Sequence, residues 1–367
     1  MTYVPLVIIG AGINGLCLAK QIGQRWPSLG PIVLEQEDFA GEHTTGRNSG
    51  VLHAGIYYPT NSLKHILCIR GNQLWEQLGN ELNVPIQRCG KFIIANKTQE
   101  EILNQVYEQS RLNNVPNIKY AGPEQLANLQ KYADVSKAIY SASTGIIDVS
   151  GTMRALELSL PEYDAHLIKK CKVLNINHVN DKFHLETTQE EITCSYLINA
   201  GGLFSIENRL KLNLTDLTNY YVKGNYIKTT QSFFKNSLIY PVPLPQLKGL
   251  GIHSLIDTDG ILRFGPNTED VQEIDYNISN DVIEKMLPAV KTQFFNIDEQ
   301  KISLDYCGIR PKIIKDDKLY SDFWIKGHEE INIENYIELC GIESPGLTAA
   351  PAIAEYIVNK YLSTKIN

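Results

Sequence analysis

The sequence predicts an α/β fold in which a Rossmann-like domain is interleaved with a second domain rich in antiparallel strands. Three observations carry this prediction. A strand, a glycine-rich turn, a helix and another strand follow one another within the first 36 residues, as in a βαβ unit. Segments of alternating polarity with many aromatic residues fill two later regions. Apolar strands of the first kind return in the middle of the chain and near its end.

The first unit begins with residues 4–9, VPLVII, a short apolar run that ends at Gly10. Such a run is typical of a strand buried on both faces of a parallel sheet. The segment GAGINGLCLAKQIGQRW then predicts a turn that leads into a helix. PIVLEQ, residues 31–36, predicts a second buried strand that ends in an acid.

The sheet-rich regions contain segments that alternate in polarity, so we expect antiparallel strands there. Charged helical segments are expected between residues 98 and 132. The predicted antiparallel strands are residues 89–96, 219–230, 249–257 and 260–267.

Residues 166–201 contain three apolar strand segments, residues 336–344 contain another, and residues 350–363 predict a helix. Strands and helices of the nucleotide-binding kind therefore occur at the start, the middle and the end of the chain. We expect a discontinuous nucleotide-binding domain and a second, substrate-binding domain between its parts. The predicted ranges are 1–85, 145–215 and 300–367 for the first domain, and 86–144 and 216–299 for the second.

The bulk properties exclude several classes of protein. Hydrophobic residues make up 43% and charged residues 20% of the 367-residue chain, as in ordinary globular proteins. A net charge of −7 argues against a nucleic-acid-binding surface. Seven scattered cysteines without a CxxC pair fit a reduced, cytoplasmic protein, and we expect no metal site. We identify no signal peptide and no transmembrane segment, which leaves peripheral membrane contact open.

Gly10, Gly12 and Gly15 form the motif G-x-G-x-x-G between the first strand and the helix. The first glycine permits the tight turn, the second lets the backbone approach a pyrophosphate, and the third lets the helix pack closely on the strand. Glu35 follows Gly15 by 20 residues at the end of the second strand, where an acid accepts hydrogen bonds from ribose hydroxyls. This combination predicts a dinucleotide site and argues against NADP.

The fingerprint by itself does not choose between NAD and FAD. A flavin ring needs a second cradle lined by backbone, which the segment HTTGRNSGVLHAG, residues 43–55, could supply. A second clue is LINAGGLFS, residues 197–205, which ends a buried strand in small residues that let the backbone pack against a cofactor.

At these residues the sequence resembles the FAD-dependent oxidoreductases of the D-amino-acid-oxidase superfamily, and within it the L-2-hydroxyglutarate dehydrogenase/oxidase family. The long second piece below is specific, whereas the first is shared by many flavoproteins. The segment GIRPKI resembles a shorter branch of the family, because the best-known members are longer between the GPN and GIR segments. The matching pieces are VIIGAGINGL, HTTGRNSGVLHAGIYYPTNSLKHILCIRGN, CGKFIIA, STGIIDV, LINAGGL, IYPVPLP, LGIH, GILRFGPN and YCGIRPKI.

The resemblance implies a glutathione-reductase-like FAD fold and an FAD cofactor. We expect FAD to be bound without a covalent bond, although Cys307 lies one position away from the segment that tethers flavin in some relatives and His43 is another conceivable tether. The residues expected to bind the cofactor are Gly10, Gly12, Ile13, Asn14, Gly15, Glu35, Gln36, Thr44, Thr45, Arg47, Asn48, Ser49, Gly50, Val173, Ala200, Gly201, Gly308, Arg310, Gly341, Ser344, Pro345, Gly346, Leu347 and Thr348.

The resemblance also implies the catalytic residues. Arg310, in the G-x-R-P segment, is expected to bind the substrate carboxylate, because a guanidinium grips a carboxylate through two hydrogen bonds. Oxidation of a 2-hydroxy acid moves a hydride from C2 to flavin N5 and needs a base for the hydroxyl proton. Histidine suits that role. His53 is favoured as the base because it lies in the stretch expected beside the flavin, and His253 is the alternative base or an orienting group.

Three further side chains near His53 are candidates for binding the substrate. Tyr57 and Tyr58 are predicted to contact it, although core aromatics with a polar tip are an equal alternative. Lys64 could attract an acidic substrate, but an exposed lysine is the favoured interpretation.

The leading hypothesis is the FAD-dependent oxidation of a small 2-hydroxy acid, namely L-2-hydroxyglutarate to 2-oxoglutarate. The alternatives are oxidation of the C–N bond of an amino acid, oxidation of glycerol 3-phosphate, or a flavin-binding electron carrier without turnover. The sequence leaves the electron acceptor open among oxygen, a quinone and another protein. It predicts a cytoplasmic location and leaves contact with the inner membrane open.

Overall fold

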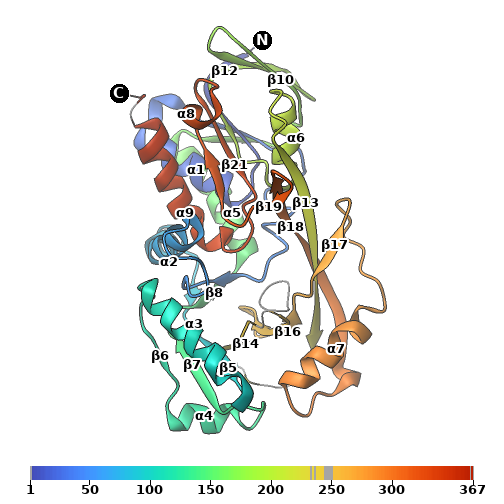
Figure 1. Ribbon diagram of the computed structural model, residues 1–367. Helices are drawn as coiled ribbons and strands as arrows, with labels where there is room; N and C mark the ends of the chain where they lie inside the picture. Colours follow the sequence, from blue (N-terminus) through green and yellow to red (C-terminus); the bar gives the residue numbers. More distant parts are fainter. Residues whose placement is uncertain (1, 232–233, 235–236, 244–250, 364, 367) are drawn as a thin grey trace.

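The computed structural model describes residues 2–366 except 232–233, 235–236, 244–250 and 364. Within the described residues, three sheets organise the chain. Figure 1 shows the first sheet with α1, α5 and α9 at one end of the molecule, and α3, α4 and α7 at the other. The long strands β13 and β18 run between the two ends.

The first sheet has eight strands among the described residues and corresponds to the predicted Rossmann-like part. β1 is central and pairs in parallel with both β2 and β12, while β2 pairs with β9 and β12 with β21, again in parallel. Its core strand residues, such as Leu6 and Ile198, are fully buried, as expected for apolar runs covered on both faces. The strands are β1 Thr2–Ile9, β2 Ile32–Leu34, β9 His166–Ile168, β10 Val173–Val179, β11 Lys182–Thr187, β12 Glu191–Asn199, β20 Trp324–Lys326 and β21 Tyr336–Cys340.

The second sheet has ten strands among the described residues and is mostly antiparallel, as predicted. One pairing differs, since β5 pairs antiparallel with β7 but in parallel with β14. Residues 249–250 of the predicted strand 249–257 lie outside the described residues. The strands are β5 Lys91–Ala95, β6 Ile118–Tyr120, β7 Lys137–Ser141, β13 Leu217–Thr229, β14 Leu238–Pro241, β15 His253–Ile256, β16 Leu262–Gly265, β17 Glu269–Val271, β18 Ile302–Lys315 and β19 Lys318–Leu319.

The helices lie largely where the sequence places them. The range 98–132 also contains the strand β6, because residues 118–120 pair with β7. The C-terminal helix begins at Gly346 and continues as a π-helical turn over Val358–Leu362. The helices are α1 Ile13–Arg25, α2 Leu63–Glu81, α3 Glu100–Leu112, α4 Pro123–Leu129, α5 Val149–Ser159, α6 Ser205–Leu210, α7 Val282–Gln293, α8 His328–Ile331 and α9 Gly346–Ile357.

A small third sheet and one pair of helices bring together segments that are far apart in the sequence. The third sheet consists of β3 Val51–Leu52, β8 Gly145–Ile147 and β4 Ile86–Gln87. The helices α2 and α9 are in close contact, and the indole of the buried Trp75 donates to the carbonyl of Thr348 at 3.0 Å. The start of α9 is therefore fixed next to the segment that follows β3.

The predicted domain boundaries stay a prediction. β18 falls inside the range 300–367 that the sequence assigns to the nucleotide-binding domain. Its backbone pairs with β13 along most of its length, so the strand is part of the second sheet. Gly308 and Ile309 of β18 lie against the loop that follows β2 (described below).

Candidate active site

The turn between β1 and α1 has the geometry that its glycines predict. Gly10 has a φ of +102°, and a Cβ added to it would lie 2.6 Å from the carbonyl oxygen of Ala200. A Cβ on Gly15 would lie 1.9 Å from the carbonyl oxygen of Gly10, so the third glycine permits close helix packing. Gly12 differs, because its Cβ would meet only the hydroxyl of Thr45, at 3.2 Å. The space beside Gly12 is therefore open, and Gly12 lines both of the cavities described next.

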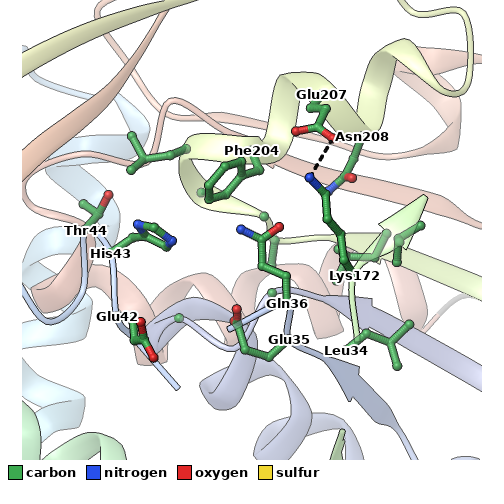
Figure 2. A pocket seen from close by; sticks show the side chains of 18 of the residues that line it. Leu34, Glu35, Gln36, Glu42, His43, Thr44, Lys172, Phe204, Glu207 and Asn208 are labelled. Atoms are coloured by element: carbon green, nitrogen blue, oxygen red, sulfur yellow. Dashed lines mark ion pairs between the residues drawn. The ribbon is translucent and has the colours of Figure 1, made fainter. Parts of the chain in front are cut away.

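A small cavity of about 90 Å³ lies beside this turn, and Figure 2 shows its side chains. Glu35 lines it and is 8% exposed. Its carboxylate accepts hydrogen bonds from the backbone N–H of Ala11 at 2.7 Å and of Glu37 at 3.0 Å. A carboxylate has about four lone-pair positions, so Glu35 keeps acceptor capacity for ribose hydroxyls. The predicted cofactor residues on this wall are Gly10, Gly12, Glu35, Gln36, Thr44, Thr45, Val173, Ala200 and Gly201.

Several side chains in and around the small cavity were not among the residues predicted to bind the cofactor. The ring of His43 lies between the hydroxyl of Tyr276, at 2.8 Å from Nδ1, and the carboxylate of Glu37, at 3.0 Å from Nε2. Phe204 packs edge-on against His43, with ring centroids 5.1 Å apart. Lys172 and Glu207 form an ion pair of 3.6 Å at the opposite side. His43 and Phe204 lie in the quoted segments 43–55 and 197–205 but were not predicted to line this cavity, whereas no motif marks Lys172 or Glu207.

A large cavity of about 630 Å³ adjoins the small one, and residues such as Gly12, Thr45 and Ala200 line both. The two cavities together offer an elongated site. Of the remaining predicted cofactor residues, Gly15, Gly50, Gly341 and Thr348 line neither cavity. The others line the large cavity, namely Ile13, Asn14, Arg47, Asn48, Ser49, Gly308, Arg310, Ser344, Pro345, Gly346 and Leu347.

The loop that carries residues 44–50 is fastened to β18 of the second sheet. Thr44 donates its hydroxyl hydrogen bond to the carbonyl of Ile309 at 3.1 Å, and Tyr306 donates to the carbonyl of Asn48 at 2.8 Å. A Cβ added to Gly308 would lie 2.2 Å from the carbonyl oxygen of Arg47, so only glycine permits this approach. The loop is thus a backbone-lined wall, as the sequence predicts.

The two predicted histidines line the same cavity. The backbone N–H of His53 donates to Thr348 Oγ1 at 2.9 Å, and its Nε2 lies 3.3 Å from Ser344 Oγ. Nδ1 of His253 lies 2.8 Å from the carbonyl oxygen of Gly251, which can only accept, so Nδ1 carries the proton and Nε2 has the lone pair. Removal from water, reinforced by the positive charge of Lys91, lowers the pKa of each histidine to about 3. Both rings are therefore neutral near pH 7.

Arg310 extends into the same cavity. Its one hydrogen bond to a described residue runs from Nη2 to the carbonyl of Asn267, at 3.4 Å. In the described part of the chain, no carboxylate forms an ion pair with Arg310. A guanidinium that faces a cavity in this way can take a ligand carboxylate through two parallel hydrogen bonds.

Lys64 is buried, which corrects the expectation of an exposed lysine. It is 8% exposed because α2 packs against the C-terminal segment, and its Nζ lies 2.9 Å from Glu343. Lys312 contacts the same carboxylate at 2.7 Å. Burial alone would raise the pKa of Glu343, but the two lysines hold it below its usual range. This cluster of two cations and one anion forms part of the wall of the large cavity.

Tyr57 and Tyr58 both line the large cavity, and their contact with the substrate stays a prediction. Burial raises the pKa of both phenols, so both are protonated near pH 7. Tyr226 and Tyr240 also line the cavity and were missed. The strand that carries Tyr226 was predicted, but the sequence does not show which of its faces meets the site, and no strand was predicted around Tyr240, which lies on β14.

Two classes of site are not found among the described residues. No group of three or more His, Cys, Asp or Glu side chains is placed to hold a metal ion in the part of the chain that the structure describes. Over the same residues, no helix is long and apolar enough to cross a membrane.

These observations define the class of protein. A Rossmann-type sheet, a glycine turn that opens at Gly12 and an acid at the end of β2 form a dinucleotide site, and the adjoining cavity has room and a backbone-lined wall for a second ring system. The buried carbonyl of the Asn14 side chain, which lacks a partner among the described residues, adds a polar group at this wall. The fold and site are those of a flavin-dependent oxidoreductase.

Comparison with known proteins identifies the family. A family model described as "FAD dependent oxidoreductase" matches residues 5–360. The chain belongs to this family and is an FAD-dependent oxidoreductase.

The chain is similar to the mitochondrial L-2-hydroxyglutarate dehydrogenase of Arabidopsis thaliana, with 29% identity over 98% of this chain and 83% of the relative. The human L-2-hydroxyglutarate dehydrogenase is 32% identical over 71% of this chain, and the match covers 60% of the human protein. The longer relatives thus contain sequence that this chain does not match.

Solved structures agree on the fold. The L-α-glycerophosphate oxidase of Mycoplasma pneumoniae, solved with FAD bound, superposes with a TM-score of 0.85 at 23% identity, over 98% of this chain and 94% of the other. Glycine oxidase from Geobacillus kaustophilus gives 0.80 at 15% identity, over 98% and 94%. These structures confirm the predicted fold class.

Proposed function

We propose that the protein oxidises L-2-hydroxyglutarate to 2-oxoglutarate. The observation that carries this proposal is the guanidinium of Arg310, which faces the large cavity without a carboxylate partner among the described residues, in a wall that also contains two neutral histidines. The relatives named L-2-hydroxyglutarate dehydrogenase support the choice of substrate.

The charges of the cavity support a substrate with two negative charges. Among the described residues that line it, four side chains are cationic, and two are carboxylates. The histidines add no charge, because their pKa values lie near 3. A site with an excess of positive charge attracts and orients a dianion better than a neutral amino acid. The side chains counted are Arg47, Lys64, Arg310 and Lys312 against Asp270 and Glu343.

The proposed roles follow from the contacts. Arg310 binds the C1 carboxylate and so orients C2 and its hydroxyl group. His53 takes the hydroxyl proton on its neutral ring, and Ser344 orients that ring through its contact with Nε2. His253 is held in one tautomer by the carbonyl of Gly251 and faces the same space. FAD, when bound, supplies the oxidising power by accepting the hydride from C2.

Most of the residues expected to hold FAD line one or both of the two cavities. Glu35 and the turn around Gly12 are proposed to bind the ribose and the pyrophosphate, and residues 44–49 the flavin. The helix α9 begins at Gly346, on the wall of the large cavity, where the positive end of its dipole would favour negative charge on a bound flavin.

An anaerobic reduction test decides among the candidate substrates. The yellow holoprotein is mixed without oxygen with L-2-hydroxyglutarate, and the flavin absorbance near its visible maximum is followed. We expect rapid bleaching with the L-enantiomer and none with D-2-hydroxyglutarate or L-glutamate. Bleaching by glycerol 3-phosphate or by amino acids alone would assign the protein to those substrates, and no bleaching by any of them would favour an electron carrier.

We also propose a cytoplasmic location and leave the electron acceptor to experiment. Six of the seven cysteine thiols are buried and all seven are free, which fits a reducing compartment. Reoxidation of the reduced holoprotein by oxygen, a soluble quinone or a protein acceptor can be compared directly. The rates separate the three possibilities.

A further inference from the structure

Lys91 is a buried lysine that the site so far does not use. It is the first residue of β5, between β7 and β14, and is 1% exposed. Within the described part of the chain, it forms no ion pair and no hydrogen bond through Nζ. Lysine is almost never fully buried unless it is paired, because removing an ammonium from water is costly.

Lys91 lies behind two tyrosines, Tyr57 and Tyr240, that line the large cavity. Its Nζ lies 4.9 Å from the ring centroid of Tyr57 and 4.6 Å from that of Tyr240. Both rings line the large cavity, and both hydroxyl oxygens are buried without a hydrogen-bond partner among the described residues. The ring of Tyr240 also stacks on His253, with centroids 3.8 Å apart. A cation and two unpartnered phenols are thus gathered behind one end of the cavity.

No anion in the described structure balances this cation. Cation–π contacts with two tyrosines compensate only part of the lost hydration. Burial lowers the pKa of Lys91 to about 7, so the amine is neutral in a large fraction of molecules at physiological pH. The titratable groups that interact with Lys91 electrostatically or through a ring include no carboxylate. They are His53, Tyr57, Cys68, Tyr240 and His253.

We propose that Lys91 is a positioning residue that selects a second carboxylate of the substrate, at the end of the cavity formed by Tyr57, Tyr240 and His253. Arg310 holds the carboxylate next to the reacting carbon, and the positive charge of Lys91 acts on the distal carboxylate through the tyrosine wall. The anion supplies the charge that the described protein lacks there, and Lys91 takes up a proton from solvent as the anion enters. This inference rests on the proposed function and adds a reason for selecting dicarboxylates over monocarboxylates.

The test uses two ligands that cannot be oxidised. The FAD holoprotein is titrated with glutarate, a dicarboxylate, and with butyrate, a monocarboxylate, and binding is followed by flavin absorbance and by calorimetry in buffers of different ionisation enthalpy. At pH 8 we expect glutarate to bind with uptake of about 0.8 proton, because a group with a pKa of about 7 is mostly neutral there and a 100-fold coupling to the anion would raise that pKa by about 2 units. Butyrate should bind more weakly, with no proton uptake.

The variant Lys91→Met keeps the length of the side chain and removes its charge. At pH 6, where Lys91 is charged with and without ligand, we expect it to weaken glutarate binding about 100-fold, the size of a Coulomb interaction over roughly 6 Å at an effective dielectric constant of 20, and at pH 8 to abolish proton uptake. Butyrate binding should change by less than about threefold by the same reasoning. Lys137→Met is the matched control, since Lys137 lies on the neighbouring strand β7, 4.3 Å from the ring of Tyr120 and outside the cavity.

Several outcomes would overturn the inference. Lys91→Met with the glutarate affinity and proton uptake of the wild type would refute it, as would an equal loss for glutarate and butyrate. If this variant does not fold, the wild type still decides. Its affinity for glutarate should fall about tenfold per pH unit above pH 7.5 while that for butyrate stays constant, and a flat profile for glutarate refutes the inference.

The same experiments separate this inference from the proposed function. If the wild type binds glutarate with proton uptake but L-2-hydroxyglutarate does not bleach the flavin, the reaction is wrong and the role of Lys91 in selecting a dicarboxylate stands. If the flavin is bleached but Lys91→Met behaves like the wild type, the reaction stands and the role of Lys91 falls.

Discussion

Arg310 and the two histidines are proposed to carry the chemistry because their surroundings leave the guanidinium free to bind an anion and keep both rings neutral. Toward the described residues, the guanidinium of Arg310 has one long hydrogen bond, to a backbone carbonyl, and the histidine rings are kept neutral. The oxidation of a 2-hydroxy acid requires a cation that binds the carboxylate through two hydrogen bonds and a neutral base that takes the hydroxyl proton. Substitutions at these residues should therefore separate substrate binding from proton removal.

Arg310→Lys should weaken substrate binding more than it slows the reaction of bound substrate. A lysine offers a point charge in place of a fork, so the loss is expected to be about 2–4 kcal/mol, as for a truncated charged hydrogen-bonded pair. The concentration dependence of anaerobic flavin reduction measures both quantities. Arg263→Lys is the control, because Arg263 pairs with Asp257 and Asp305 and does not line the cavity. An unchanged half-saturating substrate concentration in Arg310→Lys would contradict the assigned role.

His53→Ala should slow anaerobic flavin reduction by a factor of about 10² to 10⁴ and leave FAD binding largely intact. The rate should show no titration of His53 between pH 5 and 8, because its pKa of about 3 keeps the ring in the base form throughout that range. Stopped-flow absorbance measures the rate, with His253→Ala as the comparison. A wild-type rate in His53→Ala and a slow rate in His253→Ala would exchange the two roles.

Lys91→Met should stabilise the protein when no ligand is bound. Because burial lowers the pKa of Lys91 from 10.5 to about 7, the unfolded chain binds more protons than the folded one between those pH values, and stability rises with pH across that window. The penalty of the charged lysine is therefore complete below pH 7 and gone by about pH 10.5. We expect a gain of about 2–4 kcal/mol at pH 6 that shrinks toward pH 10.

Denaturant unfolding at several pH values measures this gain. Lys137→Met, made on the neighbouring strand at a partly exposed lysine, should show no comparable gain. A gain in Lys91→Met that is the same at pH 6 and pH 10 would show that it comes from packing and not from charge.

The three glycines in the turn from β1 to α1 have different structural roles. The first and third have close backbone neighbours, whereas Gly12 has open space toward the cofactor cavities. Gly12→Val should therefore give a folded protein that does not retain FAD. Gly15→Val should impair folding itself, because its Cβ would overlap the carbonyl oxygen of Gly10 at 1.9 Å.

The two variants can be compared by the flavin spectrum of the purified protein and by circular dichroism. Native dichroism without bound FAD is the expected result for Gly12→Val. Retention of FAD by this variant would mean that the pyrophosphate does not pass Gly12.

The two sheets together form the site, and their arrangement bears on how FAD is attached. Cys307 is 1% exposed, its thiol donates to the carbonyl of Tyr276 at 3.2 Å, and it does not line the large cavity, although its neighbour Gly308 does. Both ring nitrogens of His43 have partners, Tyr276 and Glu37. Neither candidate tether presents a free nucleophile to the flavin, so we propose non-covalent FAD.

Acid precipitation tests this attachment. The holoprotein is precipitated with acid and centrifuged, and FAD is expected in the supernatant with the spectrum of the free cofactor. Flavin fluorescence that stays with the denatured pellet would contradict the proposal, and Cys307→Ser would then show whether this thiol is the tether.

Much of the fold could be predicted because it depends on local patterns. Apolar runs bounded by glycine predicted β1 and β2, and alternation predicted β13 and β16. The parallel pairing of β5 with β14 could not be predicted, because pairing depends on contacts between segments far apart in the sequence. The strand β6 was missed for the same reason, since only its pairing with β7 defines it.

The sequence by itself determined the glycine turn, the acid at Glu35, the family resemblance and the residues that motifs mark, such as His53 and Arg310. Backbone conformation and cofactor chemistry demand specific residue types at fixed spacings, so these features can be read from sequence. Only the tertiary structure decided that Lys64 is buried against Glu343 and that Lys91 lies behind Tyr57 with no ion-pair partner among the described residues. Burial and charge balance are properties of packing between distant segments, and a lysine in a sequence shows neither what surrounds it nor whether an anion lies near.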